Sequence, residues 1–241
     1  MIRYLLGIDD TDNAESRGTG HLVRALADWL ALSGPVIPEA VTRHQLLVDA
    51  RIPFTSHNSS ACLSLRTEGP EEVWNAARGF LLQESAPDAD VGLCMAASDK
   101  VNQAVQAFGR LAKREVLTEP EAHRTAHEAG ARLAKLTGTG GGIIGALAAV
   151  GLHHSGQDGR FLWLPGLRDL RGRHAVADVQ RSARIDRVCT LAGLDLPADA
   201  MVDFGDWVRP VLHQGCATVF VQEKNHEWSI LGKDEIKRLS N

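Results

Sequence analysis

The stretch YLLGIDDTD, residues 4–12, joins an apolar run directly to three acidic residues and a threonine. The apolar run predicts a buried strand, and the residues after it predict a loop at the strand's carboxyl end, where open sheets usually bind ligands. Asp9, Asp10 and Asp12 would repel one another unless a cation lay among them. A divalent ion that accompanies a phosphate is a common solution. The stretch therefore predicts a magnesium-dependent phosphate site.

The composition is typical of a globular protein, with 44% hydrophobic and 23% charged residues in 241. A net charge of -4 argues against gross non-specific binding to nucleic acid but allows a local basic face. The four cysteines form no C-x-x-C pair, the N-terminus lacks the pattern of a signal peptide, and no apolar run is long enough to span a membrane. We therefore expect a cytoplasmic protein with reduced thiols and no membrane function.

The hydrophobic pattern of the first half predicts strands and helices in alternation after the acidic loop. Helices are expected over residues 21–32, 70–83 and 100–113, and strands over 44–50, 61–66 and 88–97. A polar loop over 51–60 links two of the strands; it either hydrogen-bonds phosphate or ribose or is an ordinary connection. This pattern fits an α+β or α/β layer fold.

The second half is expected to begin at Glu119-Pro120, which divides the chain into domains 1–118 and 119–241. Helices are expected over 121–136, 143–151, 175–191 and 233–239, and strands over 161–164 and 216–222. Gly130 lies inside the first of these helices and weakens it. The glycine-rich run 137–142 leads into a helix that is apolar all round and therefore buried.

The glycine run contains Gly140-x-Gly142-x-x-Gly145, which matches the dinucleotide-binding fingerprint. That motif normally follows a strand, whereas a helix is expected here. A narrower expectation is that free amides at the helix N-terminus contact a phosphate or another polar ligand. For Gly145 and Gly151, a role in close helix packing is an equal alternative.

Other candidate residues have weaker patterns. His153, His154 and His213 lack a third ligand at characteristic spacing, so hydrogen-bonded or surface histidines are favoured over a metal site. Six arginines predict a solvated face, with phosphate or RNA contact as the alternative. They are Arg168, Arg171, Arg173, Arg181, Arg184 and Arg187. Asp10-x-Asp12 also resembles the haloacid-dehalogenase phosphatases, but Ala14 departs from that pattern, and we rank metal binding first.

Three segments taken together resemble the archaeal agmatidine synthase family, whose enzymes modify the wobble cytidine of an isoleucine tRNA. They are GIDDTD at 7–12, IPF at 52–54 and GIIGALAAVG at 142–151, and PVL at 210–212 resembles a later family segment. The resemblance implies a kinase-like α/β domain that binds ATP and Mg²⁺, followed by a ferredoxin-like α+β domain that receives agmatine. In that family ATP is cleaved to AMP, the cytidine is activated by phosphorylation, and the amine displaces the phosphate.

The resemblance also assigns expected roles to individual residues. Asp9, Asp10 and Asp12 would be catalytic and would hold the magnesium ion. The residues expected to contact ATP are Thr11, Thr19, His21, His57 and Asn58, and those expected to contact the amine are Gly140, Gly141, Gly142, Ile143, Ile144 and Gly145. If phosphate activation and amine attack are coupled, the acidic loop and the glycine loop should face one cleft.

The sequence departs from the family at three positions. His21 stands where the family has a phosphorylatable threonine, although Thr19 is near, and Thr55 and His57 replace a lysine and an arginine. The loss of two cations weakens the stabilisation of a charged transition state, which leaves a non-catalytic nucleotide- or RNA-binding homologue as an alternative. The family also continues into an OB-fold and a zinc ribbon that hold tRNA. We therefore expect ATP and a small amine as partners and leave tRNA open.

Overall fold

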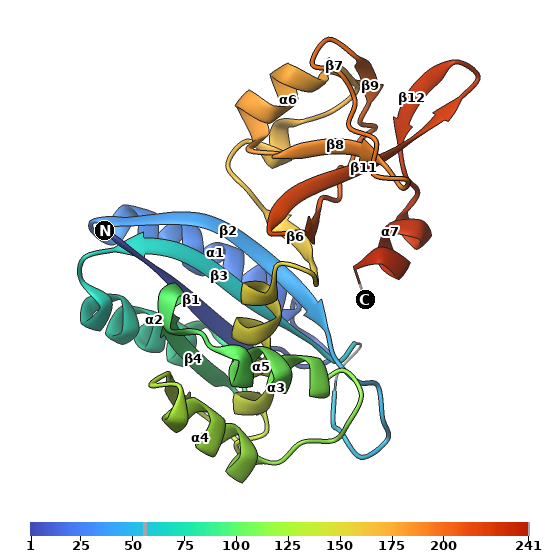
Figure 1. The fold of residues 1–241 in the computed structure, drawn as a ribbon. Coiled ribbons are helices and arrows are strands. Elements are labelled where there is room, and N and C mark those ends of the chain that lie inside the picture. Colours follow the sequence, from blue (N-terminus) through green and yellow to red (C-terminus); the bar gives the residue numbers. More distant parts are fainter. Residues whose placement is uncertain (55–56, 241) are drawn as a thin grey trace. The chain divides into compact units, whose positions relative to one another are not determined.

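The computed structural model describes residues 1–54 and 57–240 and divides the chain into two compact units, Met1–Ser155 and Gly156–Asn241 (Figure 1). The division differs from the expected boundary after residue 118. Residues 119–155 belong to the first unit because their helices pack against its sheet and its other helices. The mixed α+β class that the sequence predicts is confirmed.

The first unit contains a five-stranded antiparallel sheet with the strand order β5-β4-β1-β3-β2. The strands are β1 (Ile2–Asp9), β2 (Val36–Gln45), β3 (Ser59–Thr67), β4 (Gly92–Ala97) and β5 (Arg132–Lys135). With α1 (Thr19–Ser33) and α2 (Pro70–Glu84), the first four strands follow the βαββαβ order called ferredoxin-like. This order was expected in the second half of the chain, after a kinase-like domain.

Two layers of helices cover the sheet (Figure 1). Helices α1 and α2 contact each other, and α1 lies on β2 and β3. Helices α3 (Gln103–Leu111), α4 (Glu119–Glu128) and α5 (Gly142–Ser155) form the other layer, in which α5 contacts β1, β3 and β4. Because both faces of β1 are covered, its residues 5–8 are all buried, as a continuous apolar run in a strand predicts.

Helix α5 lies unusually close to the sheet because small residues stand at the contacts. A Cβ atom at Gly7 would lie 1.8 Å from the carbonyl oxygen of Ala146, so only glycine fits there. At the other end of the helix, a Cβ atom at Gly151 would lie 2.1 Å from the carbonyl oxygen of Val105 in α3. The helix is thus held between the sheet and α3, and the packing role considered for Gly151 is confirmed.

Three expected elements differ from the observed ones. The strand expected over 44–50 is the end of β2, which stops at Gln45. The helix expected over 121–136 ends at Glu128, because Gly130 takes a φ of +64° and the chain continues as β5. The helix expected over 175–191 ends at Ala183, where Arg184 at φ +47° reverses the chain into a strand. In both helices a residue in the left-handed region ends the helix.

The second unit is a mixed sheet with the strand order β6-β10-β11-β12-β9-β7, and β8 lies parallel to β11. The strands are β6 (Arg160–Trp163), β7 (Arg173–Ala175), β8 (Arg187–Thr190), β9 (Met201–Asp203), β10 (Val211–His213), β11 (Cys216–Lys224) and β12 (Glu227–Ile230). Helices α6 (Val176–Ala183) and α7 (Lys233–Leu239) accompany them. No helix in the described parts of either unit has the length and apolar character needed to cross a membrane.

Replacing Gly7 by alanine tests the close approach of α5 to the sheet. We expect Gly7→Ala to lower the free energy of unfolding by about 3 kcal/mol or more, because the added methyl group overlaps a backbone oxygen that has no room to move. Chemical denaturation measures the change.

Gly79→Ala is the matched control, since Gly79 lies exposed inside α2 with no atom near its Cβ position. It should raise stability by about 0.5–1 kcal/mol through helix propensity. Equal stabilities of Gly7→Ala and the unsubstituted protein would contradict the packing described here.

Candidate functional site

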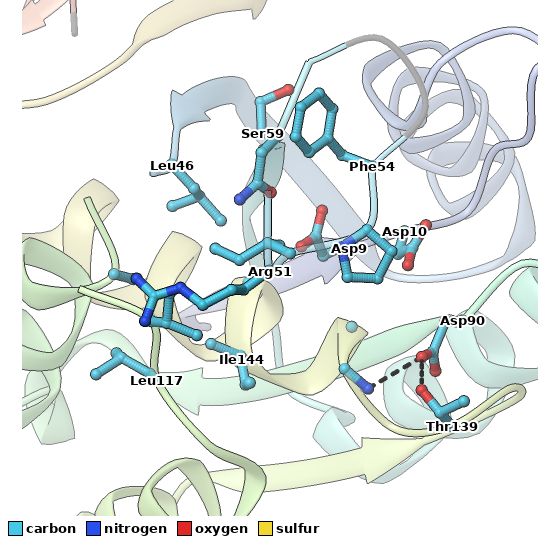
Figure 2. Close-up of a pocket in the computed structure, with 18 of the residues that line it drawn as sticks. Asp9, Asp10, Leu46, Arg51, Phe54, Ser59, Asp90, Leu117, Thr139 and Ile144 are labelled. Carbon is cyan, nitrogen blue, oxygen red and sulfur yellow. Dashed lines mark hydrogen bonds between the residues drawn. The ribbon is translucent and has the colours of Figure 1, made fainter. Parts of the chain in front are cut away.

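A cavity of about 330 Å³ lies within the first unit, at the carboxyl end of β1 (Figure 2). Four segments line it: the acidic loop, residues 46–59, the connection between α3 and α4, and the glycine loop at the start of α5. The lining includes Asp9, Asp10 and Asp12 as well as Gly141, Gly142, Ile144 and Gly145. The expectation that the acidic and glycine loops face one cleft is confirmed.

Asp9 is the last residue of β1, and its carboxylate lies against the first turn of α5. A Cβ atom at Gly145 would lie 1.7 Å from Asp9 Oδ2, so this glycine makes room for the carboxylate. Burial raises the pKa of Asp9 to about 8, with further increases from the negative charges of Asp10, Asp12 and Asp90; a backbone hydrogen bond from Asp10 opposes them. A cation at this position would remove the cause of the shift.

Asp10 follows at the edge of the cavity with a φ of +54°, in the left-handed region that few residues other than glycine adopt. Such backbone conformations occur often at ligand sites. Burial raises the pKa of Asp10 to about 6, and the charges of Asp90 and Asp12 raise it further. In Figure 2 the Asp9 and Asp10 side chains lie near each other, next to the opening of the cavity. They form the acidic pair of the site.

Asp12 is turned partly away from this pair by hydrogen bonds to the start of α1. Its Oδ1 accepts from the Thr19 amide at 3.1 Å and from the Thr19 hydroxyl at 2.8 Å. The Thr11 amide donates to Thr19 Oγ1 at 3.2 Å. Thr11 and Thr19 are buried, and neither is among the described residues that line the cavity. These bonds close the loop between β1 and α1, which is a structural rather than a cofactor-binding contact.

The other residues expected to contact ATP divide into two groups. His21 lies on α1 with its Nε2 2.8 Å from Arg17 Nη1, away from the described cavity lining. His57 and Asn58 do line the cavity. Asn58 Nδ2 donates to the Leu47 carbonyl at 2.6 Å and thereby fixes the loop after β2. Thr55, the other departure from the family, lies outside the described residues.

Asp90, which the sequence did not single out, holds the glycine loop. Its carboxylate accepts from the Gly140 amide at 2.7 Å, from the Gly141 amide at 3.1 Å and from the Thr139 hydroxyl (Figure 2). The loop amides expected to bind a phosphate are therefore already bound to a carboxylate. Only the pairing of β4 with β5 brings residue 90 to this loop, so no local pattern in the sequence could have indicated the contact.

The glycine fingerprint follows a strand after all, because β5 precedes it where a helix was expected. However, a Cβ atom at Gly142 would lie 2.0 Å from the carbonyl oxygen of Asp90, and Ile143 is fully buried. Both residues pack the start of α5 against β4. A Cβ atom at Gly140 would lie 2.5 Å from Glu119 Oε2, which brings a second carboxylate to this loop. The glycines thus create space for carboxylates and backbone.

The rest of the cavity lining combines apolar side chains with further acids. Leu46, Leu117 and Ile144 form apolar wall, and Glu115 and Glu119 stand beside it. The carboxylates are partly offset by Arg51, although its guanidinium is paired with Asp49 at 2.8 Å. A cavity with this lining suits a cationic ligand with an aliphatic body, or an anion accompanied by a metal ion.

The donor set was tested for magnesium. Over residues 1–54 and 57–240, no three or more His, Cys, Asp or Glu side chains are grouped so that they could hold a metal ion. The full set of Asp9, Asp10 and Asp12 is therefore not assembled as ligands, since Asp12 bonds to Thr19. Magnesium usually takes only one or two carboxylates, with water and substrate phosphates completing its coordination. The pair Asp9 and Asp10 fits that manner of binding.

The histidines considered as metal ligands have other partners. His153 Nδ1 lies 2.7 Å from the Thr42 hydroxyl, which also lies 2.8 Å from His44 Nε2. His154 Nδ1 lies 3.1 Å from Gln106 Nε2, and the His213 ring packs on Phe220. Burial and the neighbouring His44 lower the pKa of His153 to about 3, so it is neutral. The preference for hydrogen-bonded histidines is confirmed for His153 and His154.

Comparison with known proteins gives a consistent likeness, although no family model matches the chain. Over 186 residues the chain is 29% identical to the tRNA(Ile2) 2-agmatinylcytidine synthetase TiaS of Pyrococcus horikoshii, covering 74% of this chain and 42% of that protein. The resemblance to the agmatidine synthase family is thus confirmed by a curated relative, of which the chain spans less than half the length.

Solved TiaS structures share the fold. A crystal structure of the TiaS-tRNA(Ile2)-ATP complex has a TM-score of 0.54 at 23% identity, covering 63% of this chain and 36% of that chain. The TiaS-tRNA(Ile2)-AMPCPP-agmatine complex has a TM-score of 0.53 at 22% identity, with the same two coverages. At this identity the structures establish a shared fold.

The pH dependence of stability tests the burial of Asp9. Its pKa is about 8 in the folded chain against an ordinary 3.8, so the unfolded state ionises first. The free energy of unfolding should therefore fall as pH rises from about 4 to about 8 and then level off. Asp9→Asn should flatten this fall, whereas Asp88→Asn, at an exposed position, should keep it. Melting curves across this range that are parallel for Asp9→Asn and the unsubstituted protein would contradict the assignment.

Replacing Asp90 by asparagine tests the anchoring of the glycine loop. The amide group would place N–H donors beside the donors of Gly140 and Gly141, so we expect a loss of about 1–3 kcal/mol in stability. Amide hydrogen exchange of residues 139–142 should accelerate while exchange in β1 changes little. Unchanged exchange in the loop would show that Asp90 does not hold it.

Proposed function

We propose that this chain is an ATP-dependent enzyme of the agmatidine synthase type, which activates an acceptor with ATP for attack by agmatine or a similar amine. The observation that carries the proposal is the single cavity shared by the acidic loop and the glycine loop. Its support is the likeness to TiaS, which has been crystallised with tRNA(Ile2), ATP, AMPCPP and agmatine.

The acidic end of the cavity is the proposed position of the ATP phosphates. Asp9 and Asp10 would hold magnesium, which when bound neutralises phosphate charge and polarises the phosphoryl group. Asp12 would keep the loop closed through Thr19, so that the two carboxylates hold their positions. His57 and Asn58 line the same cavity and are the proposed contacts for the rest of the nucleotide.

The opposite end is the proposed position of the amine. Agmatine-like molecules carry a cation at each end of an aliphatic chain. The lining provides Asp90 and Glu119 as carboxylates next to the glycine loop, and Leu117 and Ile144 as apolar wall. Carboxylates at this loop favour a cation over a phosphate. We therefore propose that the glycine loop shapes the amine pocket through the acids that it accommodates.

Holding both reactants in one cavity accounts for most of the catalysis that such a reaction requires. Phosphoryl transfer depends chiefly on positioning and on the neutralisation of charge. The chain supplies the positioning, because β1 and α5 are fixed against each other at Gly7 and Gly145. The position of His21 outside the described lining means that the family's threonine has no counterpart in this cavity.

The proposed acceptor is a tRNA. The sequence left this partner open because an OB-fold and a zinc ribbon were not recognised in it. The similar structures contain tRNA(Ile2), so the reservation against tRNA is not supported. The chain spans less than half of the curated relative, and other parts of the machinery could reside in a separate polypeptide.

The phosphatase alternative finds less support in the geometry. It assigns the role of acid and base to Asp12, but that carboxylate accepts two hydrogen bonds from Thr19 at the start of α1. A non-catalytic homologue would keep the cavity and bind ATP without turnover. The experiment below separates these functions from one another.

Phosphorus NMR of the full chain with Mg-ATP tests the proposed chemistry. We expect AMP to accumulate, faster with agmatine and bulk tRNA, and Asp10→Asn to slow turnover by about 100-fold, because a carboxylate that holds the metal and phosphates is lost. Asp88→Asn is the control and should turn over ATP normally.

Three other results would each contradict the proposal. ATP binding without any turnover would indicate a non-catalytic homologue. Release of phosphate from small phosphomonoesters without ATP would indicate a phosphatase. Equal AMP production by Asp10→Asn and the unsubstituted protein would separate the activity from the acidic loop.

A further inference from the structure

A second group of side chains with the character of a binding surface lies in the second unit. The connection from β9 to β10 exposes 54% of Trp207. The guanidinium carbon of Arg168 lies 4.8 Å from the centroid of its indole ring, and that of Arg209 lies 6.0 Å away. Two cations therefore accompany a single exposed indole.

The loop that carries Trp207 is anchored on both sides. Phe204 and Val208 are buried, and the Phe204 amide donates to the Gly172 carbonyl at 2.8 Å. The Gly172 amide donates in return to the Gly205 carbonyl at 2.9 Å. Because its neighbours are fixed, Trp207 is held outward by the structure of the loop. An indole held in solvent forgoes a large gain in burial, which indicates that it has a partner.

The arginines around the indole carry positive charge that is not neutralised locally. Arg160 at the start of β6 is partly buried, and its pKa is lowered by burial and by the charge of Arg209. Over the described residues, no carboxylate forms an ion pair with Arg160, Arg168 or Arg209. Asp169 and Asp206 are adjacent in sequence and reduce the net charge without pairing. An anion would relieve the repulsion between the two guanidinium groups.

We propose that Trp207, Arg160, Arg168 and Arg209 form a binding surface for single-stranded RNA. An exposed indole stacks on any base, and guanidinium groups beside it bind the phosphates of the same strand. An acidic peptide would use the arginines but would not require the indole. The choice of RNA as the polyanion rests on the proposed function, in which the acceptor is a tRNA. The surface is separate from the cavity of the first unit.

The test measures the binding of a fluorescein-labelled single-stranded RNA of about 12 nucleotides to the full chain, by anisotropy at several salt concentrations. Trp207→Leu should weaken binding by about tenfold with little change in salt dependence, because it removes stacking. Arg160→Gln and Arg209→Gln should each weaken binding and lower the slope of log affinity against log salt by about 0.7. Trp207→Tyr should retain most of the affinity, since it keeps an aromatic face.

Two substitutions serve as matched controls. Trp29→Leu removes another exposed tryptophan, on α1 in the first unit, and Arg181→Gln removes an exposed arginine paired with Asp178 on α6. Both should bind RNA as the unsubstituted chain does. Equal affinities for all variants, or equal losses for the controls and the Trp207 variant, would overturn the proposal.

Competitors and activity distinguish the remaining sources of binding. Displacement of the labelled RNA by AMP at equal nucleotide concentration would indicate a free-nucleotide site and overturn the proposal, as would equally tight binding of an RNA duplex. ATP turnover without added RNA is measured on the same variants. Turnover that is absent while RNA binding still depends on Trp207 would count against the proposed function and leave this surface standing.

Discussion

The close contact between β1 and α5 is the constraint on which the rest of the first unit depends. Gly7 lets the helix backbone lie on the strand, and Gly145 leaves space for the Asp9 carboxylate at the end of that strand. The same packing buries Asp9 and raises its pKa to about 8. One steric feature therefore both orders the fold and sets the electrostatics of the cavity.

The second determinant of the site is the placement of carboxylates on both sides of one cavity. Asp9 and Asp10 lie at the end of β1, while Asp90 and Glu119 meet the glycine loop. Only a partner with positive charge balances such a lining. A metal accompanied by phosphate at one end and an amine at the other would do so, and the family resemblance points to the same pair of ligands. Charge and ancestry thus lead independently to one proposal.

The sequence predicted the elements that depend on local pattern and missed those that depend on pairing. The apolar run before Asp9 identified β1, and the small apolar residues of 143–151 identified a buried α5. Short strands such as β5 carry too few residues for a pattern, so the helix expected there extended past Gly130. Asp90 was missed for the same reason, since its role arises from strand neighbours that are distant in sequence. Asp12 looked equivalent to its neighbours until its bonds to Thr19 were visible.

The most direct measurement is a crystal structure of the full chain with Mn²⁺ and a non-hydrolysable ATP analogue, with the metal located by its anomalous scattering. The account predicts metal density within ligand distance of the Asp9 and Asp10 carboxylates, with the nucleotide phosphates completing the coordination in the cavity beside Gly145. A nucleotide bound elsewhere, or in this cavity with both carboxylates turned away from the metal, would contradict it.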